Sequence, residues 1–561
     1  MYHIGIIALQ GHTSTAALYK QGKLLKAVSE ERFSRIKEDD SVPLSAIKFL
    51  LKSENISIRD ISVINFAWRP WVSFKSQVLR AISSPMYAFQ KRDNGNKSRF
   101  EKFLYMMSLK KTMVNYFEYC PPVNYLDHHK CHAASSIFHN KYKDGYSLVI
   151  DGAGENDTIS FYSVTDKKLK LLEAVSYPNS MGIFYSGVTK YIGFKPDSGE
   201  YKVMGLASYG KPIYKEAIKK LFIFDKKNLV KINKKYFCHE KSANNIFSEK
   251  IKEILPTGSL TIEQKQDIAK SAQCVLEEVI EEMIGKLIKK YEIQDRSNWY
   301  FSGGVFQNCV LNQHLRENIN TMNLFFSPLS SDLGTALGAS IIYGLSKNWD
   351  ITEIENLYLG PEYSNEDVEN ALINLNLKYE ANINLSEIVE EMAAGKILGL
   401  YQNASELGPR ALGNRSIIAD PRYLKMKDKI NKIIKKRESF RPFAPVIMEE
   451  EFSSYFEGDR NNYRFMIETT NAKENIKEKI QAVVHVDNTA RVQVVSEKSN
   501  ELLYRLIKSF FTKTNIPVLV NTSFNSYDEP IVNSPEDAIK RFLENDIDLL
   551  IINKYLVRKE N

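Results

Sequence analysis

Two histidines and two aspartates in the N-terminal half of the chain have the residue types of a metal site. His128 and His132 stand four residues apart in the stretch HHKCH, so a helix would put both imidazoles on one face. Asp151 follows an apolar stretch in DGAGE, and Asp332 occupies a later glycine-containing turn. Two imidazoles and two carboxylates suit a hard or borderline cation, so the four residues are candidates for an open metal site with positions left for phosphate oxygens. The two neighbours of His128 along the chain, Asp127 and His129, are alternative ligands that spacing does not exclude.

A further histidine, His12, lies in the turn LQGHTST directly after the first apolar stretch. Turns at strand ends point side chains into ligand clefts. A neutral imidazole there could remove a proton from the hydroxyl group of an acceptor. The competing interpretation is a structural turn histidine. Because of its place at a strand end, we treat His12 as a candidate general base.

The C-terminal half is marked by arginines set among glycine, proline and small polar residues. The densest stretch, GPRALGNRSIIADPR, contains Arg410 and Arg415, and KRESFRPFAP, HVDNTARVQ and NTSFN share its character. Guanidinium groups bind phosphate oxygens bidentately, and Ser, Thr and Asn add neutral donors. A solvated cationic face would instead be rich in Lys and Glu. The pattern favours a bound polyanion, and two sites in separate domains suggest an activated intermediate passed between them.

The elements that must position these residues include a repeat. Residues 3–30 and 146–176 each read as an apolar strand, a Gly-rich turn, a second strand, a Lys-rich turn and a third strand. The turn carries His12 in the first copy and Asp151 in the second. Two copies predict a duplicated β-rich unit. This organisation resembles the actin, Hsp70 and sugar-kinase architecture, which binds nucleotide between its halves.

Two further patterns place candidate residues on helices and turns. Residues 264–290 have apolar positions at helical spacing, which predicts a core-packing helix. A short strand, Trp299 to Ser302, precedes Gly303, Gly304 and a second helix. A strand–Gly-Gly–helix turn brings backbone close to a ligand and aims a helix N-terminus at phosphate or ribose.

The bulk properties bound the class of protein. A chain of 561 residues is too long for one core, because cores stop growing near about 250–300 residues, and the pattern breaks near residue 355. The net charge is +8, and the Lys and Arg residues are interleaved with 68 acidic residues. This balance allows phosphate-rich ligands without indicating nucleic acid. The cysteines are scattered without a CxxC pair, which favours a reducing compartment. With no cationic leader and no long apolar run, we expect a cytoplasmic protein.

These motifs together resemble the NodU/CmcH family of O-carbamoyltransferases, which carbamoylate antibiotics and nodulation factors. The resemblance runs nearly end to end, and the number and fixed order of the motifs argue against chance. The stretches that carry it are GHTSTAAL, EERFSRIKED, DHHKCHAAS, DGAGE, SMGIFYSGVTKYIGFKPDSGEYKVMGLASYGKP, SGGVFQN, DLGTALGAS, GPRALGNRSIIADPR, RPFAP, HVDNTARVQVV and NTSFNSYDEPIV.

The resemblance implies an α/β protein of two domains. Residues 1–355 would form a duplicated, actin-like (ASKHA) domain of the Kae1-like type, and residues 356–561 an α/β YrdC-like domain. The second domain would make carbamoyl-adenylate from carbamoyl phosphate and ATP, with Mg²⁺. The first would transfer the carbamoyl group to a hydroxyl of a small molecule, a natural product or sugar, and release AMP. Carbamate is a poor electrophile, and the mixed anhydride with AMP makes its carbonyl carbon attackable.

The resemblance also assigns roles to single residues. The metal, which is iron in similar enzymes, would be held by His128, His132, Asp151 and Asp332. His12 would face the acceptor. The carbamoyl-adenylate pocket would be lined by Ser180, Gly303, Gly304, Gln307 and Asn308. Carbamoyl phosphate and the ATP phosphates would be bound by Lys37, Arg410, Lys436, Arg441, Arg491, Asn521 and Ser523.

The sequence departs from the family pattern at two places. The run NASEL, from Asn403 to Leu407, stands where family members often read GRME-F, and Asn179 replaces a usual histidine. Neither change touches the expected metal ligands or the main set of arginines. We therefore expect an active enzyme.

Other classes of protein fit less of the chain. A tRNA threonylcarbamoyl transferase shares both domain types but would need a large basic face for RNA. An actin-like sugar kinase would leave the C-terminal arginines without a role. A non-catalytic nucleotide-binding scaffold is expected to have lost a metal ligand or a phosphate-binding arginine, and all of these residues are present here. The expected partners are carbamoyl phosphate and a hydroxyl-bearing small molecule, with no nucleic acid and no membrane, and a homodimer is allowed.

Overall fold

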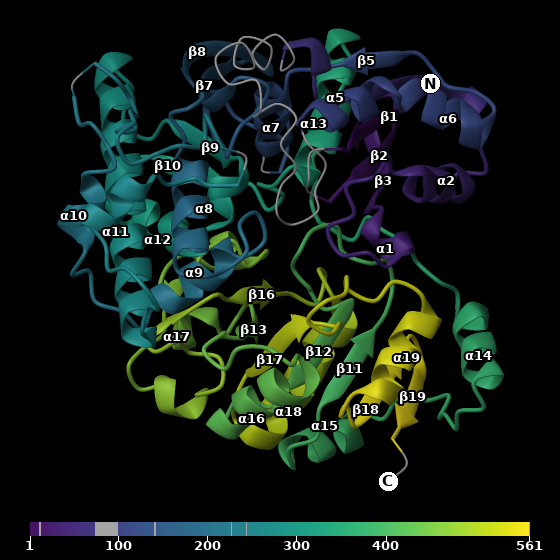
Figure 1. Cartoon of the computed structure of the whole chain (residues 1–561). Helices are drawn as coiled ribbons and strands as arrows, with labels where there is room; N and C mark the ends of the chain where they lie inside the picture. Colours follow the sequence, from purple (N-terminus) through teal and green to yellow (C-terminus); the bar gives the residue numbers. More distant parts are fainter. Residues whose placement is uncertain (10–12, 73–98, 140–141, 226, 243, 560–561) are drawn as a thin grey trace. The chain divides into compact units, whose positions relative to one another are not determined.

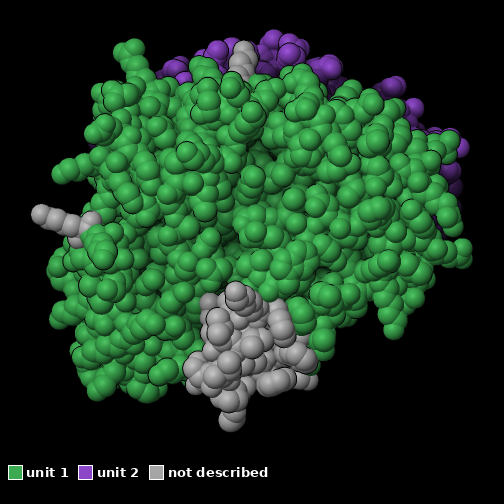
Figure 2. All heavy atoms as spheres, turned by 90° about the horizontal axis from the view of Figure 1, so that it is seen from above, with its two compact units in different colours: residues 1–30, 38–355 green, residues 31–37, 356–561 purple. Residues whose placement is uncertain are grey.

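The computed structural model describes residues 1–9, 13–72, 99–139, 142–225, 227–242 and 244–559. The chain forms two compact units, coloured separately in Figure 2. Unit 1 consists of residues 1–30 and 38–355, and unit 2 of residues 31–37 and 356–561. The expected general base, His12, lies outside the described residues. Among the described helices, none is both long and apolar enough to span a bilayer.

Unit 1 contains the same sheet topology twice (Figure 1). In the described part of the unit the strand orders are β3-β2-β1-β4-β5 and β8-β7-β6-β9-β10. In both sheets the first two pairings along the chain are antiparallel and the last two are parallel. The duplicated β-rich unit predicted from the repeat is confirmed. The strands are β1 Tyr2–Ile7, β2 Thr15–Lys20, β3 Lys23–Ser29, β4 Ile61–Phe66, β5 Val123–Tyr125, β6 Gly145–Ile150, β7 Asp157–Thr165, β8 Lys168–Ser176, β9 Asn298–Ser302 and β10 Asn323–Phe326.

Two helices, α7 (His128–Ile137) and α13 (Leu333–Ser346), pack against each other between the two sheets. Helix α13 contacts β1, β2 and β4 of the first sheet, whereas α7 contacts β6, β7 and β9 of the second. The helices approach closely at Gly338, where a Cβ atom would stand 1.8 Å from the carbonyl oxygen of Cys131. A larger residue at 338 would force the helices apart. The close pairing therefore fixes the start of α7 relative to the start of α13.

A long helix, α11 (Ile262–Lys290), covers another part of unit 1 and confirms the helix predicted at 264–290. Its N-terminus has a capping box in which the side chains of Thr261 and Gln264 bond each other's backbone N–H. Its buried face packs against α8, α9, α10 and α12. The other α-helices described in this unit are α2 Leu44–Ser53, α5 Arg99–Met107, α6 Leu109–Phe117, α8 Met181–Tyr191, α9 Glu200–Ala207, α10 Lys215–Lys219 and α12 Cys309–Asn318.

Unit 2 is built on one mixed sheet with the strand order β16-β13-β17-β12-β11-β18-β19 in its described residues. Helices and sheet share one buried apolar core, so this unit has its own hydrophobic interior. The strands are β11 Leu398–Tyr401, β12 Arg415–Ala419, β13 Ala444–Met448, β16 Gln493–Val495, β17 Val518–Ser523, β18 Leu549–Ile552 and β19 Tyr555–Arg558, with a separate pair, β14 Thr470–Asn471 and β15 Thr489–Ala490. The α-helices are α1 Glu31–Ser34, α14 Asn365–Asn374, α15 Leu385–Ala393, α16 Leu424–Lys429, α17 Phe452–Tyr455, α18 Glu501–Thr514 and α19 Pro535–Glu544.

A segment from early in the chain, residues 31–37, belongs to unit 2. Buried Arg32 donates to the carbonyl oxygen of Gly408 at 3.1 Å, and Arg35 donates to that of Ile531 at 2.8 Å. Lys37 donates to the carbonyl oxygen of Tyr527 at 2.7 Å. These cations bond backbone oxygens of unit 2 that lie outside its strands, so the segment is a structural part of unit 2.

Candidate functional site

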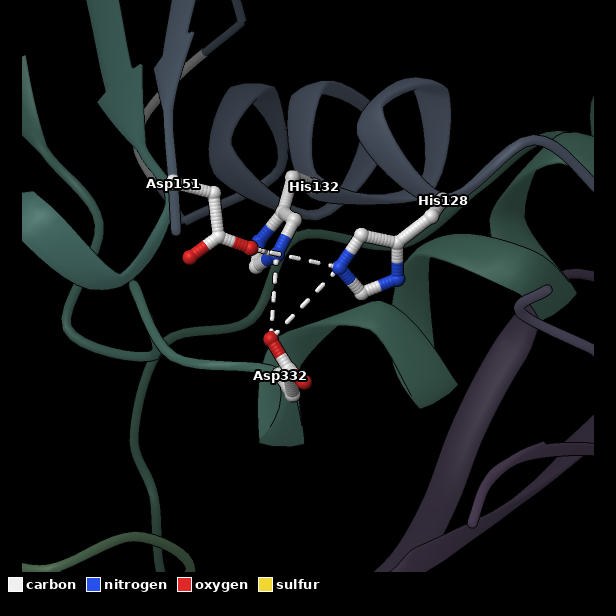
Figure 3. Close-up of side chains that lie close together, drawn as sticks. All are labelled: His128, His132, Asp151 and Asp332. Carbon is white, nitrogen blue, oxygen red and sulfur yellow. Dashed lines mark hydrogen bonds and ion pairs between the residues drawn. The ribbon is translucent and has the colours of Figure 1, made fainter. Parts of the chain in front are cut away.

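The helix start at α7 places the two candidate histidines. Asp127 is the N-cap residue, and its carboxylate accepts a hydrogen bond from the backbone N–H of Lys130 at 2.7 Å. The helix begins at His128, so His132 follows after one turn and its imidazole lies on the same face. Both histidines are fully buried. Buried imidazoles at a helix start need specific partners, and Figure 3 shows those of this pair.

The partners are Asp151, which follows β6, and Asp332, which directly precedes α13 (Figure 3). The Nε2 atoms of both histidines lie 3.4–3.5 Å from Asp151 Oδ2 and 3.5 Å from Asp332 Oδ1. One ligand atom from each residue lies within 4.8 Å of the others, so the group could hold a metal ion. Bonds of about 2.1 Å from one ion place neighbouring ligand atoms about 3.0–3.4 Å apart, close to these distances.

Backbone donors orient Asp151 toward the histidines. Its Oδ1 atom accepts hydrogen bonds from the N–H of Gly152 at 2.8 Å and of Gly304 at 3.2 Å, which leaves Oδ2 facing the imidazoles. The Gly303-Gly304 turn can approach so closely because Gly303 has a φ of +95° and a Cβ there would lie 2.3 Å from the carbonyl oxygen of Ile150. The Gly-Gly turn therefore contacts a candidate metal ligand directly.

In the cluster, the attraction between imidazoles and carboxylates outweighs the effect of burial on their charges. Burial lowers the pKa of His128, but Asp332 and Asp151 outweigh it and hold that pKa well above its ordinary value. Burial opposes ionisation of Asp151 as well, yet the hydrogen bonds to His128 and His132 hold its pKa well below the usual range. Two ionised carboxylates and neutral imidazoles would present two negative charges to a bound ion. This charge matches a divalent cation.

The two alternative ligands are engaged elsewhere. Asp127 caps α7 and forms an ion pair with Arg69. The Nδ1 atom of His129 lies 2.8 Å from the hydroxyl of Ser160, and neither residue belongs to the converging group. The geometry thus separates ligands that spacing alone could not distinguish.

The side chains expected at the carbamoyl-adenylate pocket have structural partners. Ser180 caps α8 and donates to the carbonyl oxygen of Gly152 at 2.7 Å. Asn308 caps α12 and exchanges amide hydrogen bonds with Gln273, at 2.8 and 3.2 Å. Gln307 is exposed at the end of a short 3₁₀ turn. Ser180 and Gly304 thus adjoin Asp151 or the residue after it, whereas Asn308 binds α11.

In unit 2, a buried carboxylate organises the loop that carries Arg410. Glu406 Oε1 accepts hydrogen bonds from the backbone N–H groups of Leu412, Asn414 and Arg415, at 2.8, 2.7 and 3.2 Å. On the other side of the loop, Asn521 on β17 donates to the carbonyl oxygen of Ala411 at 3.1 Å. The loop is therefore held from both sides, and half-buried Arg410 projects from a rigid frame.

The structure gives Arg415 a structural role, which corrects its interpretation as part of a polyanion site. Its side chain is fully buried and its guanidinium lies 3.7 Å above the ring of Tyr401. The guanidinium donates to backbone carbonyl oxygens of four residues: Pro361, Gln402, Asn403 and Asn414. These bonds use most of its donors, so Arg415 holds the strand ends together.

Of two adjacent lysines, Lys435 is the buried one and Lys436 is exposed. The Nζ atom of Lys435 donates to the hydroxyl of Ser523 at 3.1 Å and to the side chain of Asn525 at 2.8 Å. Burial lowers its pKa well below the ordinary value, and the charges of Arg437, Arg441 and Lys37 add to this effect. The family resemblance implies Lys436 for the phosphate site. Lys435, and not Lys436, bonds the expected residue Ser523 and has its pKa lowered by the charges of Arg441 and Lys37.

Arg491, the remaining expected phosphate ligand, is half-buried. Its charge acts on His485 in the same HVDNTARVQ stretch, where burial and then Arg491 lower the pKa to about 4. The same stretch ends at Gln493, which donates to the carbonyl oxygen of Leu412 at 2.9 Å. The stretch thus reaches the loop that carries Arg410.

Comparison with known proteins identifies the family. A model described as carbamoyltransferase N-terminus matches residues 3–341, and one described as carbamoyltransferase C-terminus matches residues 389–559. The chain belongs to the carbamoyltransferase family. Its members include O-carbamoyltransferases, and this carbamoyltransferase is accordingly an enzyme of carbamoyl transfer.

Two relatives and one solved structure show how far the similarity extends. Nodulation protein NolNO of Sinorhizobium fredii is 32% identical over 98% of this carbamoyltransferase and 79% of its own length. The 3'-hydroxymethylcephem-O-carbamoyltransferase of Amycolatopsis lactamdurans is 30% identical over 45% of this chain and 47% of its own length. A structure of full-length HypF in the phosphate- and nucleotide-bound form is 14% identical, with a TM-score of 0.34 over 63% of this chain and 56% of that one.

Proposed function

We propose that this enzyme is an ATP-dependent O-carbamoyltransferase that works in two steps. Unit 2 would form carbamoyl-adenylate from carbamoyl phosphate and ATP, and unit 1 would transfer the carbamoyl group to a hydroxyl of a small-molecule acceptor. The observation that carries the proposal is the converging group of His128, His132, Asp151 and Asp332, in a chain that matches carbamoyltransferase models in both its parts.

The two steps balance as follows. Carbamoyl phosphate, ATP and water give carbamoyl-adenylate, pyrophosphate and inorganic phosphate. Water first cleaves carbamoyl phosphate into carbamate and inorganic phosphate. A carbamate oxygen then forms the new bond to the α-phosphorus of ATP, and the bond from that phosphorus to the pyrophosphate oxygen breaks. The acceptor hydroxyl then attacks the carbamoyl carbon, AMP leaves, and the hydroxyl proton passes to a base. We assign that base to His12, because a neutral imidazole is suited to it.

The residues of unit 2 would handle the phosphates. Lys37, Arg410, Arg441, Arg491 and Ser523 are proposed to bind carbamoyl phosphate and ATP. We add Lys435, because its Nζ atom bonds Ser523 and the charges of Arg441 and Lys37 help to lower its pKa. Cations aimed at leaving phosphate oxygens stabilise the charge that develops there. Asn521 would act by holding the Arg410 loop.

The residues of unit 1 would hold a divalent metal, which we propose to be Fe²⁺. Two imidazoles and two carboxylates fit such an ion, and Asp151 Oδ1 is anchored so that Oδ2 is left for it. When bound, the ion would polarise phosphate or carbamoyl oxygens. The Gly303-Gly304 turn, which touches Asp151, is proposed to contact the adenylate through its backbone.

The fold of unit 1 supports this division. The strand order of unit 1 is the same in both halves, as an actin-like domain of the Kae1-like type requires. For unit 2 we propose the YrdC-like class. The acceptor is proposed to be a small natural product or a sugar, since relatives carry nodulation and hydroxymethylcephem names.

The test measures pyrophosphate release from ATP and carbamoyl phosphate, with and without candidate acceptors. We expect pyrophosphate that depends on carbamoyl phosphate and falls at least tenfold in Arg491→Ala. Arg505→Ala, which removes an exposed arginine of the same unit, is the matched control and should release pyrophosphate like the wild type. Formation of ADP, or no pyrophosphate with any acceptor or tRNA, would contradict the proposal.

A further inference from the structure

A buried carboxylate, Glu155, lies next to the metal-site candidates and bonds the backbone of one of them, His128. Glu155, in the turn between β6 and β7, has a side chain that is only 4% exposed. Its Oε1 atom accepts hydrogen bonds from the backbone N–H of Arg69 at 2.9 Å and from Arg69 Nε at 3.3 Å. It also accepts, at 3.3 Å to each oxygen, from the backbone N–H of His128. This N–H is one that an α-helix start leaves without an intrahelical partner.

Arg69 completes the arrangement by reaching a second acid. Its guanidinium forms an ion pair with Asp127, the residue that caps α7. Arg69 therefore lies between Glu155 and Asp127, and both carboxylates bond the first turn of the helix. We call these three residues, Arg69, Glu155 and Asp127, the helix clamp.

The helix clamp joins segments from both halves of unit 1. Arg69 follows β4 of the first sheet, and Glu155 follows β6 of the second. The same stretch after β4 orients the imidazole of His128, because the carbonyl oxygen of Ala67 lies 3.2 Å from His128 Nδ1. With a proton on Nδ1, the Nε2 atom presents its lone pair to the cluster. The backbone and the ring of His128 are therefore both fixed from the stretch that the clamp holds.

We propose that Glu155 is a positioning residue for the metal: by holding the backbone of His128 and the Ala67–Arg69 stretch, it sets the Nε2 atom of His128 toward Asp151 and Asp332. The inference rests on the proposed metal function of that cluster. Without the carboxylate, the N–H of His128 and the guanidinium of Arg69 lose their shared acceptor. The first turn of α7 and the oxygen of Ala67 then move independently, and the imidazole loses its fixed direction.

The size of the effect follows from the behaviour of outer-sphere partners in other metal sites, where their removal weakens metal affinity about 10–100-fold. We expect that loss in Glu155→Ala. Glu155→Gln keeps one oxygen that can accept from both Arg69 and His128, so it should restore most of the affinity. Arg69→Met removes the clamp from its other end and should weaken binding about tenfold.

The matched control is Glu30→Ala. Glu30 is a similarly buried carboxylate of unit 1 that accepts backbone hydrogen bonds at a helix start, from Ser45 at 3.0 Å and Ala46 at 2.8 Å. Its loss should lower thermal stability as Glu155→Ala does. It should leave metal affinity unchanged, because Glu30 holds α2 and not α7.

The experiment titrates metal-free full-length protein with Zn²⁺ against a competing chelator, and with Co²⁺ while its visible absorption bands are recorded. We expect a 10–100-fold rise in the dissociation constant and altered Co²⁺ bands in Glu155→Ala, with recovery in Glu155→Gln. Unchanged affinity in Glu155→Ala and Arg69→Met, or an equal loss in Glu30→Ala, would overturn the positioning role and leave the metal site standing. A wild type that binds neither ion would overturn the metal site itself. If Glu155→Ala does not fold, Arg69→Met decides between these results.

Discussion

At the scale of single residues, two arginines of one sequence stretch have different roles because their surroundings differ. Arg410 and Arg415 lie five positions apart in one glycine-rich stretch. Arg410 is half-buried on the loop, whereas Arg415 is buried against Tyr401 and bonded to backbone carbonyl oxygens. Burying an arginine is tolerated only when its donors are satisfied, and carbonyl oxygens do this as well as phosphate would. A role for either arginine therefore follows from its partners.

Replacing Arg415 tests its structural role. Arg415→Lys keeps the charge but cannot reach the carbonyl oxygens of Gln402, Asn403 and Asn414 at once, so buried acceptors lose their partners. We expect the free energy of unfolding of unit 2 to fall by about 2–4 kcal/mol, measured by urea unfolding. The KM for carbamoyl phosphate of the folded fraction should stay within about twofold. A large rise in KM without a loss of stability would instead favour a phosphate-binding role.

A buried histidine should make the protein sensitive to acid. Burial lowers the pKa of His139 to about 3, against an ordinary value of 6.5. Because the folded-state pKa is depressed, the unfolded state binds the proton more tightly, and stability falls as the pH drops below about 6.5. Between pH 7.0 and 5.5, the free energy of unfolding of His139→Phe should therefore fall by about 1 kcal/mol less than that of the wild type. Parallel curves of unfolding free energy against pH for the two proteins would contradict this prediction.

At the scale of elements, helix starts and tight turns carry the candidate chemistry. The metal-site candidates stand at the starts of α7 and α13 and after β6, where side chains leave a sheet or helix toward a common point (Figure 3). In unit 2 a π-helical turn, Ile430–Ile434, continues α16, and Lys435 follows it. Such a turn shifts the register by one residue, which decides that Lys435 rather than Lys436 points inward.

The loop that carries Arg410 should depend on Glu406. In Glu406→Ala the backbone N–H groups of Leu412, Asn414 and Arg415 lose their acceptor inside the protein. We expect the KM for carbamoyl phosphate in pyrophosphate release to rise about tenfold or more, because an imprecise ligand loop is costly. Glu406→Gln, which keeps one oxygen, should lie between this variant and the wild type. An unchanged KM in the alanine variant would show that the carboxylate has no part in binding.

At the scale of the whole molecule, the two candidate ligand sites belong to different units with separate cores. All four metal-site candidates lie in unit 1, and the cationic set lies in unit 2, including Lys37 from the segment 31–37. Because stabilisation by a ligand acts on the part that binds it, the two ligands should act on different cores.

Calorimetry of the full chain checks this separation. A divalent metal at about one hundred times its dissociation constant should stabilise unit 1 by about 2.7 kcal/mol, and carbamoyl phosphate should raise the transition of unit 2. Chelation should reverse only the first effect. The variant Asp332→Asn should abolish the shift caused by metal and keep the shift caused by carbamoyl phosphate. Two ligands that move one common transition equally would contradict the assignment of separate sites.

The sequence determined those features that are local or repeated. Apolar periodicity predicted the helix at 264–290, and the strand–turn–strand repeat predicted the duplicated sheets, since both depend on neighbours along the chain. The types and spacing of His128, His132, Asp151 and Asp332 made them candidates that the structure brings together, although Asp127 and His129 stayed open as alternatives. Family motifs then predicted carbamoyl transfer, which the family models confirm.

Only the tertiary structure decided which of two neighbouring candidates faces a site and which distant groups support it. His128 rather than His129 belongs to the metal-site candidates, and Lys435 rather than Lys436 bonds Ser523. Arg415 is buried in the interior of unit 2. Residues 69 and 155, or 32 and 408, meet across long stretches of chain that carry no periodic signal. Buried polar groups must find partners wherever the packing of elements brings them, and this requirement acts in three dimensions, where spacing along the sequence has no influence.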